Sequence, residues 1–257
     1  PGATPAVASF RERHIEGAVF FDIDDIADPD TDFPHMLPPP AIFAEKVGAL
    51  GITDTDPVVV YDDQGVFSAA RVWWTFRAMG HENVRVLNGG LPKWIGEGRT
   101  VTHQPSTIAP TRYRAAPETK FAANADDVRR AIQSEAAEIV DARPRERFLG
   151  AAPEPRENLR SGAMPGALNV PYSALTTPEG VLKSPDDLLR LIVEAGVTLE
   201  KPVITTCGSG VTAALLSLAL ETIGHSRHSL YDGSWTQWGD IRNDERRFPV
   251  VNSAKAD

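Results

Sequence analysis

The stretch Thr205-Thr206-Cys207-Gly208-Ser209-Gly210-Val211-Thr212-Ala213 decides how the rest of the chain is interpreted. It follows a short apolar run at residues 202–204, typical of a buried strand, and opens an apolar run at residues 211–223 that predicts a helix. A strand, a turn with two glycines and a helix start together predict a cup of backbone N–H groups. Such a cup stabilises negative charge by ~0.3–1 kcal/mol, and by up to ~2 kcal/mol where partly buried. Cys207 is therefore a candidate nucleophile, because the thiolate is the reactive form of cysteine.

The composition is that of an ordinary globular protein. The chain has 257 residues, 42% hydrophobic and 24% charged, enough for one large domain or two of ordinary size. No apolar run is long enough to span a bilayer. The net charge of −9 argues against nucleic acid or an anionic membrane as a partner, because both require a basic surface.

Cysteine usage limits the chemistry further. Cys207 is the only cysteine, which excludes an internal disulfide framework and a cysteine-based zinc site. We expect neither a metal nor a cofactor. A lone thiol favours a reducing compartment, so we expect a cytoplasmic protein.

The two halves of the chain repeat each other in the same order. Residues 14–20 match residues 163–169, and residues 57–65 match residues 202–210. The second match places Asp62 where the other half has Cys207. Because the period is near half the chain, the repeat predicts a duplicated domain and not a solenoid.

Each half alternates short strands with helices, which predicts an α/β fold with mainly parallel sheets covered on both faces. The expected strands are residues 58–61, 84–87, 138–141, 203–206 and 229–231, and the expected helices are residues 40–50, 67–79, 126–134, 184–196 and 211–223. Asn124 and Ser184 are the predicted N-caps of two of these helices. Ligands of such sheets bind beyond the carboxyl ends of strands, where Cys207 falls.

The repeat also sets the domain boundaries that we expect. An N-terminal domain occupies residues 1–107, an extended linker rich in Thr and Pro occupies residues 108–121, and a C-terminal domain occupies residues 122–257. The second half begins with a helix and a strand that have no counterpart before His14. Since a lost strand would expose core and a sheet edge, we expect that the chain is truncated at its N-terminus and gives no information on targeting.

Five segments, in chain order, point to a family: His14-Ile15-Glu16-Gly17-Ala18, Phe67-Ser68-Ala69-Ala70-Arg71-Val72-Trp73-Trp74, Glu154-Pro155-Arg156, Cys207-Gly208-Ser209-Gly210-Val211-Thr212 and Asp232-Gly233-Ser234-Trp235. With them the chain resembles the two-domain rhodanese-type sulfurtransferases, and among these the 3-mercaptopyruvate sulfurtransferases. The resemblance covers essentially the whole chain. It implies tandem rhodanese-like domains whose first copy is catalytically silent, and Asp62 agrees because a carboxylate cannot carry sulfane sulfur.

The resemblance implies a two-step sulfur transfer. Cys207 would take sulfur from 3-mercaptopyruvate as a persulfide and release pyruvate. With no second cysteine, an external acceptor must then remove the outer sulfur: thioredoxin, a low-molecular-weight thiol or cyanide. Two alternatives stay open, a thiosulfate:cyanide sulfurtransferase and a non-catalytic sulfur-binding module. Gly208 and Ser209 favour 3-mercaptopyruvate, because thiosulfate-preferring relatives carry basic residues there.

The loop residues have implied roles of their own. Gly208 and Gly210 would keep the backbone bent and its N–H groups open. The hydroxyls of Ser209 and Thr212 would donate to the persulfide or to the substrate, and Val211 completes the substrate-contacting loop. Without the resemblance, the glycines form an ordinary turn and Thr212 only helps to start the helix.

Three residues outside the loop complete the candidate site. Arg147 and Arg156 resemble the family's binders of the substrate carboxylate, for which a planar guanidinium is suited. Taken without the resemblance, a surface arginine is the commoner explanation of either residue. His14 matches a histidine that relays a proton with the loop serine, here Ser209, although residues 1–13 contain no Asp to complete a triad. A structural, hydrogen-bonded histidine is the alternative.

Two other kinds of site fail on spacing. Residues 28–39 imitate a calcium loop, but Phe33 stands where glycine is needed. A cysteine phosphatase loop needs arginine six residues after Cys207, and Ala213 stands there instead.

Overall fold

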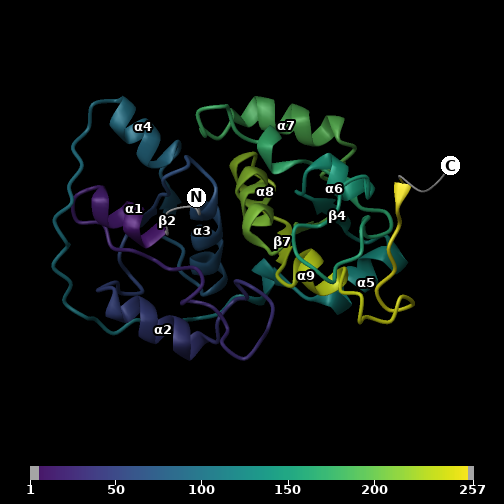
Figure 1. Ribbon diagram of the computed structural model, residues 1–257, viewed down its shortest axis with the longest axis horizontal. Helices are drawn as coiled ribbons and strands as arrows, with labels where there is room; N and C mark the ends of the chain where they lie inside the picture. Colours follow the sequence, from purple (N-terminus) through teal and green to yellow (C-terminus); the bar gives the residue numbers. More distant parts are fainter. Residues whose placement is uncertain (1–5, 254–257) are drawn as a thin grey trace.

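Figure 1 shows the computed structural model, which describes residues 6–253, with the two halves of the chain lying side by side. The predicted helices and strands are all found, with ends that agree within two residues. In this part of the chain no helix is long and apolar enough to cross a membrane.

The first half is built on a pair of parallel strands. β1 (Val58–Val60) pairs with β2 (Val84–Val86). Its helices are α1 (Ala6–Glu12), α2 (Pro40–Ala49), α3 (Ser68–Ala78) and α4 (Gly90–Gly96). Among the described residues β1 has a partner on one side only, and Val59 is 61% exposed.

The second half holds a five-stranded, wholly parallel sheet in the order β3-β7-β6-β4-β5. Its strands are β3 (Ala122–Ala123), β4 (Glu138–Asp141), β5 (Leu168–Asn169), β6 (Val203–Thr206) and β7 (His228–Tyr231). Its helices are α5 (Ala125–Ser134), α6 (Arg145–Leu149), α7 (Pro185–Glu194), α8 (Val211–Thr222) and α9 (Ser234–Trp238), with short 3-10 turns at Thr119–Phe121 and Tyr172–Ala174. The central strand β6 is buried along its whole length and points its carboxyl end at the Cys207 turn.

The two predicted N-caps are confirmed. The Asn124 side chain accepts hydrogen bonds from the backbone N–H groups of Asp126 and Asp127, as part of a capping box. The Ser184 side chain accepts one from the N–H of Asp187. These bonds satisfy amides that have no partner within a helix.

The halves are joined by a buried interface in which α3 packs against α8. Nearly all of α3 is buried, including Trp73 and Trp74. The Trp74 indole donates to the carbonyl of Phe121, at 3.0 Å. One hydrophobic core runs through both halves, so the first half is held in a fixed position against the second.

The segment at residues 108–121, predicted as a linker, lies against the first half. The backbone N–H groups of Thr111 and Ala116 donate to the carbonyls of Gly48 and Met79.

The duplicated turns use the same position for a hydrogen-bond acceptor. After β1, one carboxylate oxygen of Asp62 accepts from the N–H groups of Phe67 and Ala69, both at 2.8 Å, and the other accepts from Gln64 at 3.0 Å. After β6, the Sγ of Cys207 accepts from the N–H of Gly210 at 3.2 Å. The first turn is thus closed by a carboxyl group where the second holds a thiol.

We predict that Asp62 stabilises the first half as the cap of α3. Asp62→Ala leaves three amides without their acceptor and should lower the free energy of unfolding by about 1–2 kcal/mol. Urea unfolding measures this. Asp63→Ala is the control, because Asp63 is exposed and makes none of these bonds, so its effect should stay within ~0.5 kcal/mol. Equal effects of the two substitutions would contradict the assignment.

Candidate active site

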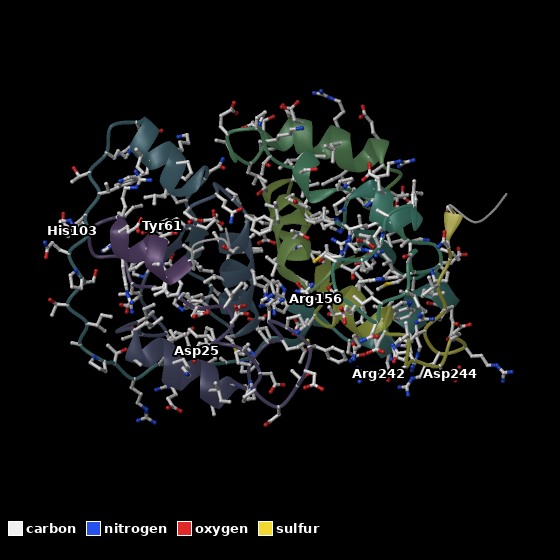
Figure 2. The ribbon with its side chains drawn as sticks, in the orientation of Figure 1. Asp25, Tyr61, His103, Arg156, Arg242 and Asp244 are labelled. Carbon is white, nitrogen blue, oxygen red and sulfur yellow. The ribbon has the colours of Figure 1, made fainter. Side chains whose placement is uncertain are left out.

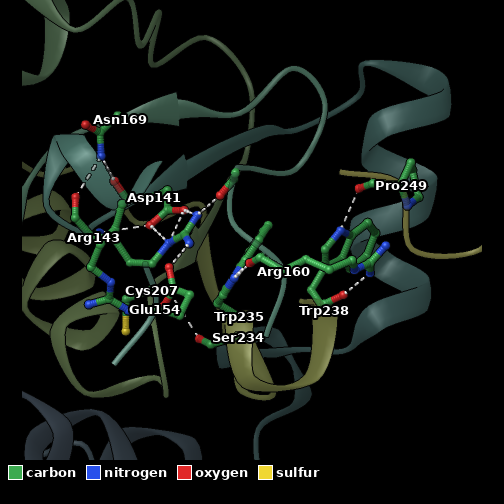
Figure 3. A network of polar contacts seen from close by, with 12 residues as sticks. Asp141, Arg143, Glu154, Arg160, Asn169, Cys207, Ser234, Trp235, Trp238 and Pro249 are labelled. Carbon is green, nitrogen blue, oxygen red and sulfur yellow. Dashed lines mark hydrogen bonds and ion pairs between the residues drawn. The ribbon is translucent and has the colours of Figure 1, made fainter. Parts of the chain in front are cut away.

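Cys207 directly follows β6, begins the turn that leads into α8, and is 2% exposed. The N–H of Cys207 donates to the Ser234 hydroxyl at 3.3 Å, and its carbonyl accepts from the N–H of Trp235 at 2.9 Å (Figure 3). These bonds tie the turn to the start of α9. The Sγ faces the turn's amides, because it accepts from the N–H of Gly210.

The glycines of the loop make room for three guanidinium groups. A Cβ at Gly208 would lie 3.2 Å from Nη2 of Arg147 and 4.0 Å from Nη1 of Arg156. Gly210 has φ +81°, and a Cβ there would lie 2.7 Å from Nη1 of Arg71. Both the backbone angle and the close approach require glycine at position 210.

The structure therefore places Arg147 and Arg156, the two candidate carboxylate binders, beside the loop. Ser209 lies between the glycines and is 9% exposed. Val211 and Thr212 form the first turn of α8, after the left-handed Gly210 cap.

Arg147 is held in place by a network of buried charges, of which Figure 3 labels Asp141, Arg143 and Glu154. Arg143, fully buried, pairs with Asp141 at 2.7 Å and with Glu154 at 2.8 Å. The second oxygen of Glu154 pairs with Arg147. The guanidinium of Arg143 also stacks over the Trp235 ring, 3.9 Å from its centroid. Burial lowers the pKa of Arg143, but Asp141 and Glu154 outweigh it and raise that pKa, so this guanidinium stays charged although it is buried.

Arg156 has a different environment. It is exposed, and among the described residues no carboxylate pairs with it. Figure 2 places it at the boundary between the two halves. Arg156 is thus the guanidinium at the loop whose charge is available to an anion from solvent.

Sequence reasoning missed a histidine of the first half that reaches the site. The Nδ1 of His35 lies 2.8 Å from a carboxylate oxygen of Asp24, and the carbonyl of His35 accepts from Arg71. Burial lowers the pKa of His35; the charges of Arg71 and Arg156 act in the same direction, and Asp24 opposes them. The imidazole is thus held near the guanidiniums that face the loop. No sequence signal marked it, since it lies in a proline-rich acidic segment outside the matched parts of the repeat.

The structure does not bring His14 to Ser209. His14 is 1% exposed and stacks on Phe10, with ring centroids 4.3 Å apart. Its Nδ1 lies 2.8 Å from the carbonyl oxygen of Phe10, and its Nε2 lies 3.1 Å from that of Gln104. Because both nitrogens are engaged within the first half, the expected proton relay is not retained, and His14 is a structural histidine.

Comparison with known proteins agrees with this geometry. A family model described as "Rhodanese-like domain" matches residues 5–97 and 124–240. The chain belongs to the rhodanese family. It is 42% identical over 231 residues to 3-mercaptopyruvate sulfurtransferase of Homo sapiens, covering 89% of this chain and 78% of that protein. It is 40% identical over 259 residues to thiosulfate sulfurtransferase of Rattus norvegicus, covering 100% and 87%. This member of the family is accordingly a sulfurtransferase.

Solved structures show the same architecture. The Tum1 protein from Saccharomyces cerevisiae superposes with a TM-score of 0.89 at 28% identity, covering 97% of this chain and 87% of that one. SseA from Escherichia coli, described with the fold and catalytic mechanism of 3-mercaptopyruvate sulfotransferases, superposes with a TM-score of 0.82 at 39% identity, covering 90% and 87%. The predicted fold class of tandem rhodanese-like domains is confirmed.

We predict that His35 lowers the free energy of unfolding of this sulfurtransferase as the pH decreases from neutral. The folded state holds the pKa of His35 below its ordinary 6.5, so the unfolded state binds the proton more readily. The contribution of the neutral His35 imidazole to the free energy of unfolding is complete above the ordinary pKa. It is lost as the pH falls from there through the lowered pKa of the folded state. His35→Gln should therefore flatten the fall in the free energy of unfolding between about pH 7 and pH 5, measured by urea titration at each pH.

His103→Gln is the control, because His103 is exposed on the first half. It should keep the wild-type dependence on pH. A His35→Gln variant with the wild-type dependence would show that this imidazole does not carry the effect.

Proposed function

We propose that the protein takes sulfur from 3-mercaptopyruvate as a persulfide on Cys207 and passes it to an external thiol or to cyanide. The observation that carries the proposal is the single thiol in a turn of backbone amides, with Arg147 and Arg156 at the neighbouring glycine. An anion-stabilising nucleophile and two guanidiniums match a donor that has both a thiol and a carboxylate.

In the first step, the Cys207 thiolate forms a bond to the donor's sulfur as the donor's C–S bond breaks. The electrons of that bond stay with carbon, which leaves as the enolate of pyruvate and takes up one proton. No outside oxidant or reductant is needed, because the sulfur is oxidised as the carbon is reduced. We assign the proton transfer to His35, paired with Asp24, and the Ser209 hydroxyl to a hydrogen bond with the reacting sulfur or the donor oxygen.

In the second step, an acceptor attacks the outer sulfur and Cys207 leaves as the thiolate. A thiol acceptor becomes a persulfide, and cyanide becomes thiocyanate. Since Cys207 is the only cysteine, no thiol of the same chain can do this. Thioredoxin or a low-molecular-weight thiol is the acceptor class that we propose.

Thiosulfate is the second candidate donor. It is favoured by the 40% identity to a thiosulfate sulfurtransferase over the whole chain. The uncharged Gly208 and Ser209 favour 3-mercaptopyruvate, since a dianionic donor is better served by basic residues in the loop itself. The positive charge near the loop comes instead from Arg147 and Arg156, which suit one carboxylate.

The donor is tested by mass and by product. We expect intact protein incubated with 3-mercaptopyruvate to gain one sulfur and to release an equal amount of pyruvate, faster than thiosulfate loads the same protein. Cys207→Ser should gain none. A preference for thiosulfate would overturn the choice of donor, and no persulfide from either compound would overturn the proposal.

The two guanidiniums are tested by conservative substitution. Arg147→Lys and Arg156→Lys keep the charge but lose the planar fork, so each should lower kcat/KM for 3-mercaptopyruvate roughly tenfold, mainly through KM. Arg145→Lys is the matched control, because Arg145 is exposed on the same helix as Arg147. An unchanged KM in both site variants would show that the donor carboxylate binds elsewhere.

A further inference from the structure

A buried ion pair joins the two halves of the chain beside the active site. Arg71, on α3 of the first half, is 2% exposed, and its Nη2 lies 2.7 Å from an oxygen of Asp232. Asp232 directly follows β7 of the second half. Taking both charges out of water is unfavourable unless further hydrogen bonds satisfy them. The other hydrogen bonds of Arg71 and Asp232 show which segments the ion pair connects.

Both partners hold one short segment of the first half. Arg71 donates through Nη2 to the carbonyl of His35, and the other carboxylate oxygen of Asp232 accepts from the N–H of Leu37 at 2.6 Å. His35 has φ +61°, a left-handed conformation that is uncommon for residues other than glycine. Such a backbone persists only where its surroundings hold it. The bonds from Arg71 in the first half and from Asp232 in the second half stabilise this backbone conformation of His35.

The same pair touches the Cys207 turn. A Cβ at Gly210 would lie 2.7 Å from Nη1 of Arg71 and 3.3 Å from the carbonyl oxygen of Asp232. Two residues after Asp232, the Ser234 hydroxyl accepts from the N–H of Cys207. The pair is therefore in contact with the segment that carries His35 and with the turn that carries the thiol.

We propose that the Arg71–Asp232 pair is a positioning clamp that sets His35 against the Cys207 turn. The first half, whose own turn carries Asp62 in place of cysteine, is then a required part of the active site. The proposal rests on the proposed function for its kinetic test but not for its structural test.

The charges around His35 allow a test that simple loss of stability would not mimic. The imidazole faces Asp24 of its own segment, Arg71 of α3, and Arg156 of the second half. Arg71→Met removes a positive charge and should raise the pKa of His35. Asp232→Asn leaves the charge of Arg71 uncompensated and should lower it. The pKa should move in opposite directions, each by roughly half a unit to one unit.

The His35 titration is read by NMR of the imidazole in the full chain, without any substrate. Arg77→Met is the matched control, because Arg77 also lies on α3 and pairs across the interface with Glu221, at 3.7 Å, away from His35. It should leave the His35 titration at the wild-type position. Identical titrations in Asp232→Asn and wild type would overturn the clamp, whatever their activity.

The kinetic test follows persulfide formation in a single turnover with 3-mercaptopyruvate. Arg71→Lys keeps the charge but loses the planar guanidinium, whose Nη2 contacts both His35 and Asp232 while its Nη1 lies beside Gly210. We expect Arg71→Lys and Asp232→Asn to slow the step at least tenfold with little change in KM, and Arg77→Met to react like wild type. Folded variants that react at the wild-type rate would overturn the proposal.

The two tests separate this inference from the proposed function. If the wild-type protein forms no persulfide, the proposed function fails while the His35 titrations still decide on the clamp. If Arg71→Met does not fold, Arg71→Lys and Asp232→Asn, checked by circular dichroism, decide it.

Discussion

A helix that follows a strand through a tight turn begins with backbone N–H groups that have no partner within the helix, and a residue at the start of the turn can supply an acceptor for amides of the turn and the helix start. Both halves of this chain use that arrangement. In the first half Asp62 fills the turn with a carboxylate, which has a structural role only. In the second half Cys207 fills it with sulfur, which can hold negative charge, accept a second sulfur and give it up. One geometry therefore yields a helix cap in one half and, in the other, the thiol that we propose as the nucleophile.

The charges around the Cys207 turn are divided between structure and ligand binding. Arg143 pairs with Asp141 and shares Glu154 with Arg147. Its charge is therefore engaged within the buried network and is not available to a ligand. Among the described residues, Arg156 has no carboxylate partner. A site with several arginines thus presents a limited net positive charge, which suits a donor with a single carboxylate. The buried pairs orient the guanidiniums of Arg143 and Arg147, and the exposed Arg156 is the one to which we assign attraction of the donor anion.

The sequence predicted the longer elements and the centre of the site. Helices such as α3 and α8 carry enough apolar periodicity to be recognised, whereas β3, β5 and α9 have two to five residues and show no period. The approach of Arg147 and Arg156 to the loop came from family resemblance. The position of His35 beside the site was missed, because its segment is held by a bond from Leu37 to a carboxylate 195 residues away, which depends on how the halves pack. His14 was misassigned, since a matched position in a repeat does not tell which carbonyls its ring nitrogens meet.

The central claim is that the amides of the Cys207 turn hold the transferred sulfur while it carries negative charge. A crystal structure of the protein after reaction with 3-mercaptopyruvate tests it most directly. We expect a second sulfur on Cys207, directed into the turn and within hydrogen-bonding distance of the backbone N–H groups of residues 208–212. A second sulfur that points out of the turn and contacts none of these amides would contradict the account.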